Sequence, residues 1–435
     1  MAQKSIQTSR LSRSASLLGT GAKVGLNYLK YYGKKSITGN SDKTDLHQEN
    51  AVAVYKTFSE LKGGPLKVAQ MLSIDQNLLP GPYAQEFSQA QYSAPPLSYP
   101  LVVRTFKREF KKEPLEIFDT FNPEASSGAS IGQVHLAQKK GHRYAVKVQY
   151  PGVAQSLKTD LAVVKPIAIR IIGLNESDMD PYFKEVEERL LEETDYALEL
   201  SRSQELTKAC LHIPGLRFPR YYKELSTSKI LTMDWMDGIP LDKFIETKAS
   251  ATVRNKIGQA LWDFYHFQIH ELQLFHADPH PGNFLVDGET LCPLDFGCTK
   301  RIDDDFYTKN FHLLKPSLLE NFQEFSKALE ALGIILPSDS PSSRETIVKT
   351  VLPSIELLAR PFRCKTFNFG DVSFMRSIYE MGEQNHQNKI LKDLRGQRGS
   401  PHSLYLNRAY FGLYSLLARL QAHIKPSTPA WILES

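Results

Sequence analysis

Two short polar loops separated by an apolar hairpin constrain the fold of this chain more than any other feature of its sequence. The first loop is His276-Ala-Asp-Pro-His-Pro-Gly-Asn283, and the second contains Asp295-Phe-Gly297. Between them, two apolar segments flank an Asp287-Gly288 pair, which favours a tight β-hairpin turn. Because a hairpin returns the chain to its starting point, we expect both polar loops to converge at one end of it.

The spacing of the polar side chains in these loops is typical of phosphoryl transfer. Asp278 precedes Asn283 by five residues, as in the D-x-x-x-x-N catalytic loop of kinases, where the Asp accepts a hydroxyl proton and the Asn binds a metal. Asp295 adds a second carboxylate for Mg²⁺. We therefore predict that Asp278 is catalytic and that Asn283 and Asp295 are metal ligands.

The two histidines of the first loop admit another interpretation. His276 and His280 stand four residues apart, the spacing at which two histidines on a helix bind zinc. Pro279 and Pro281 preclude such a helix, so we expect the histidines to shape the loop.

Upstream residues add the nucleotide-binding part of the same pattern. Residues 130–137 and 142–149 flank a Lys-Lys-Gly turn and alternate in polarity, which predicts a β-hairpin. Its second strand carries Lys147 in an Ala-Val-Lys-Val sequence, like the kinase lysine that pairs with nucleotide phosphates. A kinase fold also needs a carboxylate to hold this lysine, and the helix predicted over residues 181–207 offers Glu193, Asp195 and Glu199.

A predicted strand over residues 229–235 ends in the turn of Met233-Asp-Trp-Met-Asp-Gly238. In the order of kinase elements, this turn stands where the hinge between two lobes presents its backbone to adenine. Met233 and Met236 are therefore predicted nucleotide-binding residues.

The pattern of elements predicts an α+β fold of the protein-kinase-like, bilobal type. A small mixed α/β N-lobe precedes a larger, mainly helical C-lobe with a hairpin near 284–294, and helical segments, including one over residues 101–120, form an N-terminal extension. We predict four regions: a basic leader (1–45), a helical N-terminal extension (46–125), a nucleotide-binding N-lobe (126–235), and a helical C-lobe with the catalytic loop (236–435).

Composition excludes several other classes of protein. With 435 residues, 41% of them hydrophobic and 10% aromatic, the chain can bury a large core and is not disordered. It has four cysteines and no C-x-x-C pair, so neither a disulfide framework nor a zinc ribbon is indicated, and we expect a reducing compartment. No stretch is long and apolar enough to span a bilayer.

The net charge of +5 belongs to the first residues. Residues 1–40 contain seven of the 53 Lys and Arg residues and no acid, which leaves 46 basic and 48 acidic residues in the rest. We therefore expect no nucleic acid as a partner. The leader has three open interpretations: a basic amphipathic helix on an anionic membrane, a solvated or core-docked helix, and an organelle transit peptide.

Longer motifs carry a family resemblance. The His276–Asn283 loop, Ala129-Ser-Ile-Gly-Gln-Val-His135 and Glu193-Thr-Asp-Tyr-Ala-Leu-Glu199 resemble the signatures of the UbiB/AarF family of atypical kinase-like proteins, which includes Coq-type members linked to ubiquinone. The likeness covers about residues 50–300. It implies that ATP or ADP and Mg²⁺ are the cofactors, and that Glu199 is the partner of Lys147.

The resemblance also assigns further residues. The family has a K-x-G-Q helix that folds over the active site, and here Lys67-Val-Ala-Gln70 resembles it with Ala in place of Gly. By resemblance, Lys67 and Gln70 lie near Glu193 and Asp195 as a regulatory, family-specific group. An Ala-rich loop replaces the kinase Gly-rich loop, which implies nucleotide contacts from Ala129, Ser130 and Gly132, although Gly128 stands at an alanine position.

Three functional hypotheses follow from these residues. The leading one is an ATP- and Mg²⁺-dependent phosphotransferase or ATPase acting on a small or lipid-related molecule, in isoprenoid quinone biosynthesis or lipid metabolism. No Ala-Pro-Glu follows Asp295-Phe-Gly297, so phosphorylation of proteins in trans is not expected. The alternative is a catalytically weak, nucleotide-gated scaffold for membrane-associated biosynthetic proteins. A small-molecule kinase of the aminoglycoside or choline type is a third, less well matched class.

Partners and location complete these expectations. The expected partners are a nucleotide, a lipid or quinone-precursor ligand and an anionic membrane surface. We expect a cytoplasmic, peripheral membrane protein, or a mitochondrial matrix protein if the leader is a transit peptide.

Overall fold

In the computed structural model, the hairpin predicted over residues 130–149 is present and forms the centre of a sheet. Strands β3 (Gly132–Lys139) and β4 (His142–Gln149) pair antiparallel. Lys140 and Gly141 connect them with φ angles of 52° and 77°. Positive φ at both central residues is what a type I′ turn requires, and this turn matches the twist of the two strands.

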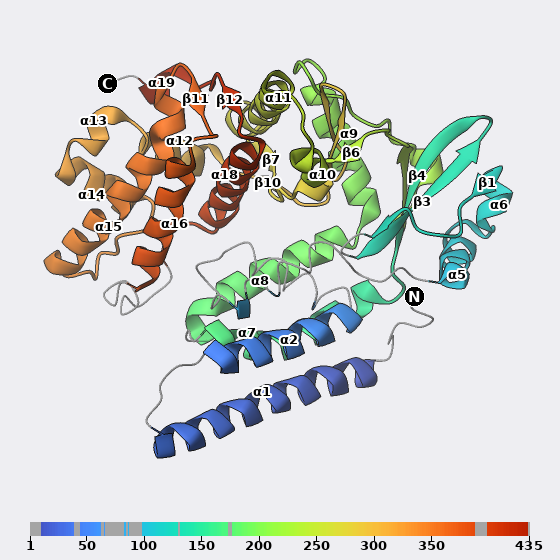
Figure 1. Ribbon diagram of the computed structural model, residues 1–435, viewed down its shortest axis with the longest axis horizontal. Helices are drawn as coiled ribbons and strands as arrows, with labels where there is room; N and C mark the ends of the chain where they lie inside the picture. Colours follow the sequence, from blue (N-terminus) through green and yellow to red (C-terminus); the bar gives the residue numbers. More distant parts are fainter. Residues whose placement is uncertain are drawn as a thin grey trace. The chain divides into compact units, whose positions relative to one another are not determined.

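The structure describes residues 10–38, 44–61, 65, 82–83, 86, 98–128, 131–172, 176–387 and 398–433. The chain divides into two compact units, Met1–Ser201 with Arg220–Trp235, and Arg202–Pro219 with Met236–Ser435. The first unit carries the central sheet and the second is mainly helical (Figure 1). The predicted order of a mixed α/β part followed by a mainly helical part is confirmed.

Three further strands complete the sheet of the first unit: β1 (Thr120–Phe121), β2 (Ser127–Gly128) and β5 (Ile230–Asp234). The strand order is β1-β3-β4-β5, and β2 also pairs with β3. Helix α5 (Tyr99–Phe110) packs on this sheet, where Val102 and Phe106 share a buried cluster with Val146 and Val148. The alternation of the strand residues therefore places one apolar face against a helix.

The helix predicted over residues 101–120 is wrong beyond Phe110. Lys111 adopts a left-handed φ of 59°, and its amide donates to the Lys107 carbonyl at 3.1 Å. A left-handed residue closes a helix instead of extending it. The chain resumes only in the short helix α6 (Pro114–Ile117) before it enters β1.

Four long helices of the first unit pack against one another (Figure 1): α1 (Arg10–Thr38), α2 (Thr44–Leu61), α7 (Val153–Ile172) and α8 (Glu176–Glu193). Leu17 and Val24 of α1 are buried in one cluster with Phe58 of α2 and Leu161 of α7. Over residues 10–38, the basic leader is thus a helix docked on a core, which is one of the three interpretations left open above.

The single helix predicted over residues 181–207 is also wrong, because it is interrupted. Helix α8 ends at Glu193, and α9 (Tyr196–Cys210) begins after a break at Thr194 and Asp195. The Asp195 carboxylate accepts from the amides of Ala197 and Leu198 at 3.0 and 3.3 Å. Asp195 therefore caps the new helix, a role for which aspartate is well suited.

The second unit contains short strands that lie beside its helices. Its helices before the site are α10 (Leu241–Glu246) and α11 (Ala251–His270). The hairpin predicted near 284–294 is confirmed as β8 (Phe284–Asp287) and β9 (Thr290–Pro293), with β6 (Ile239–Pro240) beside β8. A separate pair joins β7 (Leu274–His276) to β10 (Thr299–Arg301).

The rest of the second unit is helical: α12 (Asp304–His312), α13 (Pro316–Leu319), α14 (Phe322–Ala331), α15 (Pro341–Ala359), α16 (Val372–Gln387), α18 (Pro401–Leu420) and α19 (Ala430–Leu433), with a small pair of β11 (Phe367–Asn368) and β12 (His423–Ile424). No helix among the described residues has the length and apolar character needed to cross a membrane.

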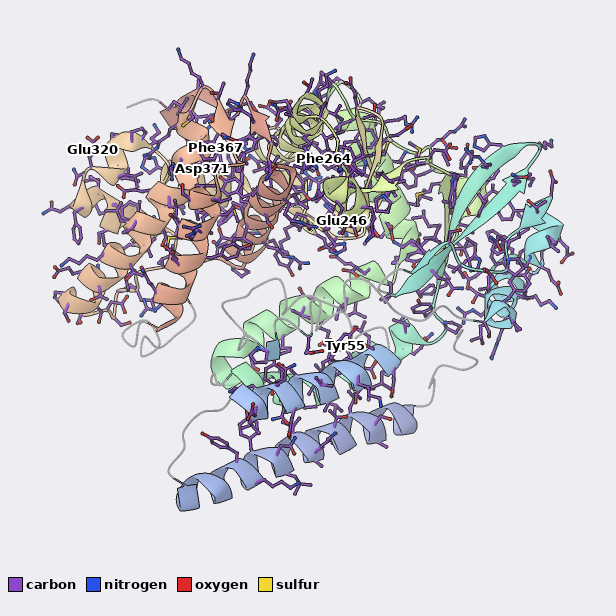
Figure 2. All side chains as sticks on the ribbon, in the orientation of Figure 1. Tyr55, Glu246, Phe264, Glu320, Phe367 and Asp371 are labelled. Carbon is purple, nitrogen blue, oxygen red and sulfur yellow. The ribbon has the colours of Figure 1, made fainter. Side chains whose placement is uncertain are left out.

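Helix α11 forms the centre of this unit. Trp262 and Phe264 are fully buried, and Phe264 lies within the unit in Figure 2. Gly258 faces β12 so closely that a Cβ atom there would collide with the Cβ of Ala422. The absence of a side chain at Gly258 is therefore what lets the chain end pack on α11.

We expect Gly258→Ala to destabilise the protein by about 1–3 kcal/mol, the usual cost of overpacking a core. The matched control is Gly25→Ala in α1, where a new Cβ would meet nothing within 4 Å. Since alanine is the better helix former, the control should be neutral or stabilising by up to about 1 kcal/mol. Thermal unfolding of both variants checks this, and equal melting temperatures would contradict it.

Candidate active site

A buried ion pair joins the strand and the helix that the sequence singled out in the first unit. Lys147 Nζ lies 2.8 Å and 3.0 Å from the two carboxylate oxygens of Glu199. Their side chains are 8% and 3% exposed. Lys147 Nζ also lies 5.0 Å from the centre of the Tyr196 ring. The pairing implied by the family resemblance is present, and the role of both residues in nucleotide binding stays a prediction.

The break before α9 is what brings Glu199 to Lys147. The Thr194 carbonyl accepts from Gln149 Nε2 at 2.8 Å and from Lys229 Nζ at 3.0 Å, so β4 and the start of β5 hold the chain where α9 begins. The Tyr196 amide donates to the Ser228 carbonyl at 3.1 Å. Because α9 is tied to both strands at its first turn, the Glu199 side chain has a fixed position opposite β4.

Gly132, a predicted nucleotide contact, has a packing role in the structure. A Cβ atom at this position would lie 2.5 Å from Tyr196 Oη and 2.6 Å from the Val148 carbonyl oxygen. Only glycine fits there without displacing β4 or the start of α9. This requirement for a glycine arises from the first unit's own packing.

The structure also describes Met233, Met236, Glu193 and Asp195, which are predicted to bind the nucleotide or to form the regulatory group. Met233 is buried in β5 opposite Ala145, and Met236 is the half-buried first residue of the second unit's main segment. Glu193 is buried at the end of α8, and Asp195 caps α9 as described above.

Four predicted residues lie outside the described part of the chain: Lys67, Gln70, Ala129 and Ser130. Their nucleotide-binding or regulatory roles remain predictions.

The predicted catalytic loop of the second unit, His276–Asn283, is held together by its own hydrogen bonds. The Asn283 side chain donates from Nδ2 to the Asp278 carbonyl at 3.0 Å, and the His280 amide donates to the same carbonyl at 2.7 Å. His280 Nδ1 accepts from the Gly282 amide at 3.0 Å. The histidine thus caps the short turn at Pro281–Asn283, which agrees with the expected loop-shaping role.

The hairpin brings Asn283 and Asp295 to the same end of the second unit's three-stranded sheet. Phe284 pairs with Pro293, and the Leu294 amide donates to the Asn283 carbonyl at 2.9 Å. Asp295 follows directly, and its Oδ1 accepts from the Gly297 amide at 2.8 Å. The predicted convergence of the two polar loops is therefore present in the backbone pairing.

These residues suit a magnesium–nucleotide complex. Among the described residues, no group of three or more His, Cys, Asp and Glu side chains is placed to hold a metal by itself. Mg²⁺ prefers hard oxygen ligands, and at nucleotide sites it takes one or two carboxylates together with phosphates and water. The carboxylate of Asp295 and the amide oxygen of Asn283 fit this kind of shared coordination.

Buried aromatic and polar groups of α11 contact the residues at the start of this loop and after Asp295. The His276 amide donates to Gln268 Oε1 at 2.9 Å, and His276 Nδ1 lies 3.0 Å from Tyr265 Oη. Burial, with a smaller effect from the Asp278 charge, raises the pKa of Tyr265 well above its usual range, so this phenol stays neutral. Phe296 is fully buried and packs near His276 and Phe264.

Arg408 is a site residue that the sequence analysis did not find. Its Nη2 donates to Asp278 Oδ1 at 2.6 Å, and the two side chains are 9% and 17% exposed. Arg408 lies in α18, far from the loop in the sequence. In the sequence, helical spacing places Arg408 next to the apolar residues Tyr405 and Ala409, which marks a cation beside the buried face of the helix but does not identify its partner.

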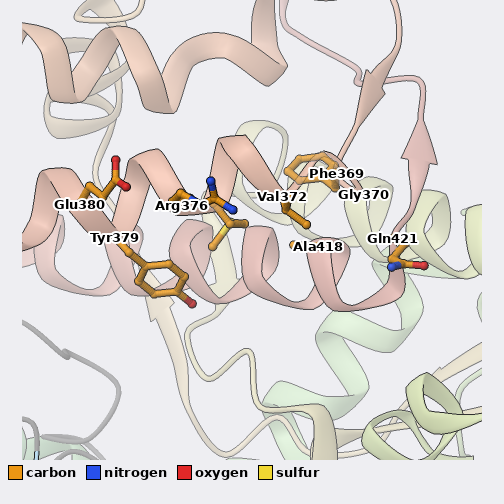
Figure 3. A pocket seen from close by; sticks show the side chains of 9 residues that line it. Phe369, Gly370, Val372, Arg376, Tyr379, Glu380, Ala418 and Gln421 are labelled. Carbon is orange, nitrogen blue, oxygen red and sulfur yellow. The ribbon is translucent and has the colours of Figure 1, made fainter.

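A pocket of 410 Å³ lies elsewhere in the second unit, between α16 and the end of α18 (Figure 3). Its wall is mainly apolar, with Arg376 and Glu380 on one side and Gln421 at one end. None of the predicted site residues lines it. The chemistry described above is therefore separate from this pocket.

Comparisons with known proteins agree with these arrangements. The chain is 28% identical to the atypical kinase COQ8B, mitochondrial, of Rattus norvegicus, across 97% of this chain and 80% of that protein. It is also 28% identical to the atypical kinase COQ8, mitochondrial, of Saccharomyces cerevisiae, across 97% of this chain and 84% of that protein. It is 30% identical to the ABC1 family protein C10F6.14c of Schizosaccharomyces pombe, across 78% of this chain and 67% of that protein.

A solved structure is also similar. The complex of Rv3197 with erythromycin, from Mycobacterium tuberculosis, matches 90% of this chain and 96% of its own with a TM-score of 0.60 and 25% sequence identity. The profile of the ABC1 atypical kinase-like domain matches residues 89–329, which is more than half of the chain and includes Lys147, Glu199, Asp278 and Asp295. The chain belongs to the ABC1 atypical kinase-like family.

Proposed function

We propose that this protein is an ATP- and Mg²⁺-dependent phosphotransferase or ATPase. The observation that carries the proposal is the Lys147–Glu199 pair, because a lysine fixed by a buried carboxylate is the phosphate clamp of kinase-like sites. In the proposal, Lys147 binds the nucleotide phosphates, and Asn283 and Asp295 hold the metal. Bound Mg²⁺ would neutralise the charge on the phosphates.

The residues of the second unit give the proposal its chemistry. Asp278 accepts the proton of the attacking hydroxyl group or orients a water molecule, as the equivalent aspartate does in kinase catalytic loops. Its loop is fixed by Asn283 and by the capped turn at Pro281–Asn283. This arrangement supports the proposal because phosphoryl transfer depends on positioned groups more than on covalent chemistry.

The acceptor we propose is a small or lipid-related molecule, in support of isoprenoid quinone biosynthesis. Only residues 298–303, including β10, separate Gly297 from α12. The long segment on which protein kinases dock peptides has no room there. The similarity to COQ8 and COQ8B is consistent with this choice of pathway.

The outer face of α1 suggests a membrane contact for this function. Leu18 and Leu26 are 63% and 57% exposed, and Lys23 and Lys30 of the same helix are also exposed, whereas Leu17 is buried. Exposed leucines beside lysines favour an anionic lipid surface, where each basic residue contributes about 1 kcal/mol before screening.

Replacing the catalytic carboxylate tests the proposed chemistry. We expect Asp278→Asn to lower Mg²⁺-dependent ADP release by about 10²–10⁴-fold, the contribution of a positioned general base. The matched control is Asp304→Asn, which changes an exposed aspartate in the same unit and should keep the wild-type rate. An unchanged rate in Asp278→Asn would contradict the assignment. Nucleotide binding without any turnover in the wild-type protein would favour the scaffold.

Vesicle binding tests the membrane contact. We expect the protein to sediment with vesicles that contain anionic lipid, and the Leu18→Ser/Leu26→Ser variant to bind them less. The control is Leu115→Ser/Leu211→Ser, which removes two leucines that do not belong to α1 and are 61% and 67% exposed. Equal loss of binding in both variants, or no loss in either, would contradict a role for α1.

A further inference from the structure

The contact between α18 and the catalytic loop is not explained by packing alone. Arg408 Nη2 lies 2.6 Å from Asp278 Oδ1, and each side chain is more than four-fifths buried. Removing a guanidinium and a carboxylate from water is costly, and the cost is offset only when the two groups meet in good geometry. A pair of this kind fixes the orientation of the carboxylate.

The same helix touches the loop again one turn later. Gly412 stands four residues after Arg408, on the same face, and a Cβ atom there would collide with the ring of Pro279. The backbone of α18 therefore lies directly against the residue that follows Asp278. A glycine at this point allows the helix to come close enough for Arg408 to reach the carboxylate.

Two further contacts fix α18 to the segment after Gly297. Lys300 Nζ lies 5.0 Å from the centre of the Tyr405 ring, and the rings of Phe306 and His402 are 5.1 Å apart. These contacts, together with Arg408 and Gly412, lie along one side of the helix. Along this one side, helix α18 thus contacts both the predicted catalytic loop and the segment that follows Asp295.

Within the loop, a histidine stands in place of a lysine that is common in kinase catalytic loops. In many kinases, a lysine two residues after the catalytic aspartate neutralises charge near the transferred phosphate, and here that position is His280. Its Nδ1 accepts from the Gly282 amide at 3.0 Å, so the ring caps the turn at Pro281–Asn283. Arg408 brings a permanent charge to the same carboxylate from a distant helix.

We propose that Arg408 is a positioning residue for the Asp278 carboxylate, and that α18 is thereby part of the machinery for phosphoryl transfer. This inference rests on the proposed function, since it concerns the same carboxylate. Arg408 acts through Asp278: it fixes the orientation of the carboxylate that is proposed to act on the acceptor hydroxyl group.

A double-mutant cycle on ADP release tests this role. Because misplacing a catalytic group by about 1 Å can cost about 10²-fold, we expect Arg408→Gln to lower kcat by about 10- to 100-fold. The affinity for MgATP, measured by its thermal stabilisation of the protein, should change less than about twofold. In the Asp278→Asn background, adding Arg408→Gln should cost less than about twofold, since residues that act as a unit are not additive.

Two other variants separate positioning from folding. Arg419→Gln makes the same change on an exposed arginine of α18 and should keep the wild-type kcat. Arg408→Lys keeps the charge but loses the planar guanidinium, so it should melt like the wild type and show a kcat between those of the wild type and Arg408→Gln. If Arg408→Gln does not fold, the Arg408→Lys result decides, and a wild-type kcat in it overturns the proposal.

The outcomes also distinguish the two proposals. Losses that multiply in the double variant, or wild-type turnover in Arg408→Gln, overturn the role of Arg408 and leave the proposed function intact. A wild-type protein without Mg²⁺-dependent turnover overturns the proposed function, and the role of Arg408 with it.

Discussion

The buried pair of Lys147 and Glu199 is the interaction on which the candidate nucleotide site depends. Two charges that are almost completely removed from water persist only when each has its partner, and removing one partner of such a pair typically costs about 3–5 kcal/mol. The fold must therefore present a strand lysine and a helix glutamate at hydrogen-bonding distance. The break at Thr194 and Asp195 achieves this, because it lets α9 start anew from anchors on β4 and β5.

The second unit meets a similar requirement with different means. Its three polar residues lie on loops at the ends of short strands, and the loops are positioned by backbone pairing, by the capped turn, and by α11 below them. Arg408 adds a long-range constraint, since it comes from a helix near the end of the chain. Asp278, Asp295 and Arg408 carry charges that water would solvate in the unfolded chain. In the folded protein, several independent contacts hold these groups in place.

The parts of this structure that depend on local sequence could be predicted. Alternating strands on either side of Lys140-Gly141 and an Asp287-Gly288 turn specify two hairpins, and both are present. The helix break before α9 could not be predicted from periodicity, because Asp195 has the right spacing for a helical face as well as for a cap. The contact of Arg408 with Asp278 depends on tertiary packing across 130 residues, which no local pattern records.

The dependence of ATP affinity on Mg²⁺, measured by isothermal titration, tests most directly whether one nucleotide uses both sets of residues. The account predicts that Mg²⁺ strengthens ATP binding in the wild type, and that Asp295→Asn keeps the metal-free affinity but loses this gain. It also predicts that Lys147→Met/Glu199→Gln, which removes both charges of the buried pair, loses binding with and without the metal. Full Mg²⁺-dependent binding in either variant would contradict the account.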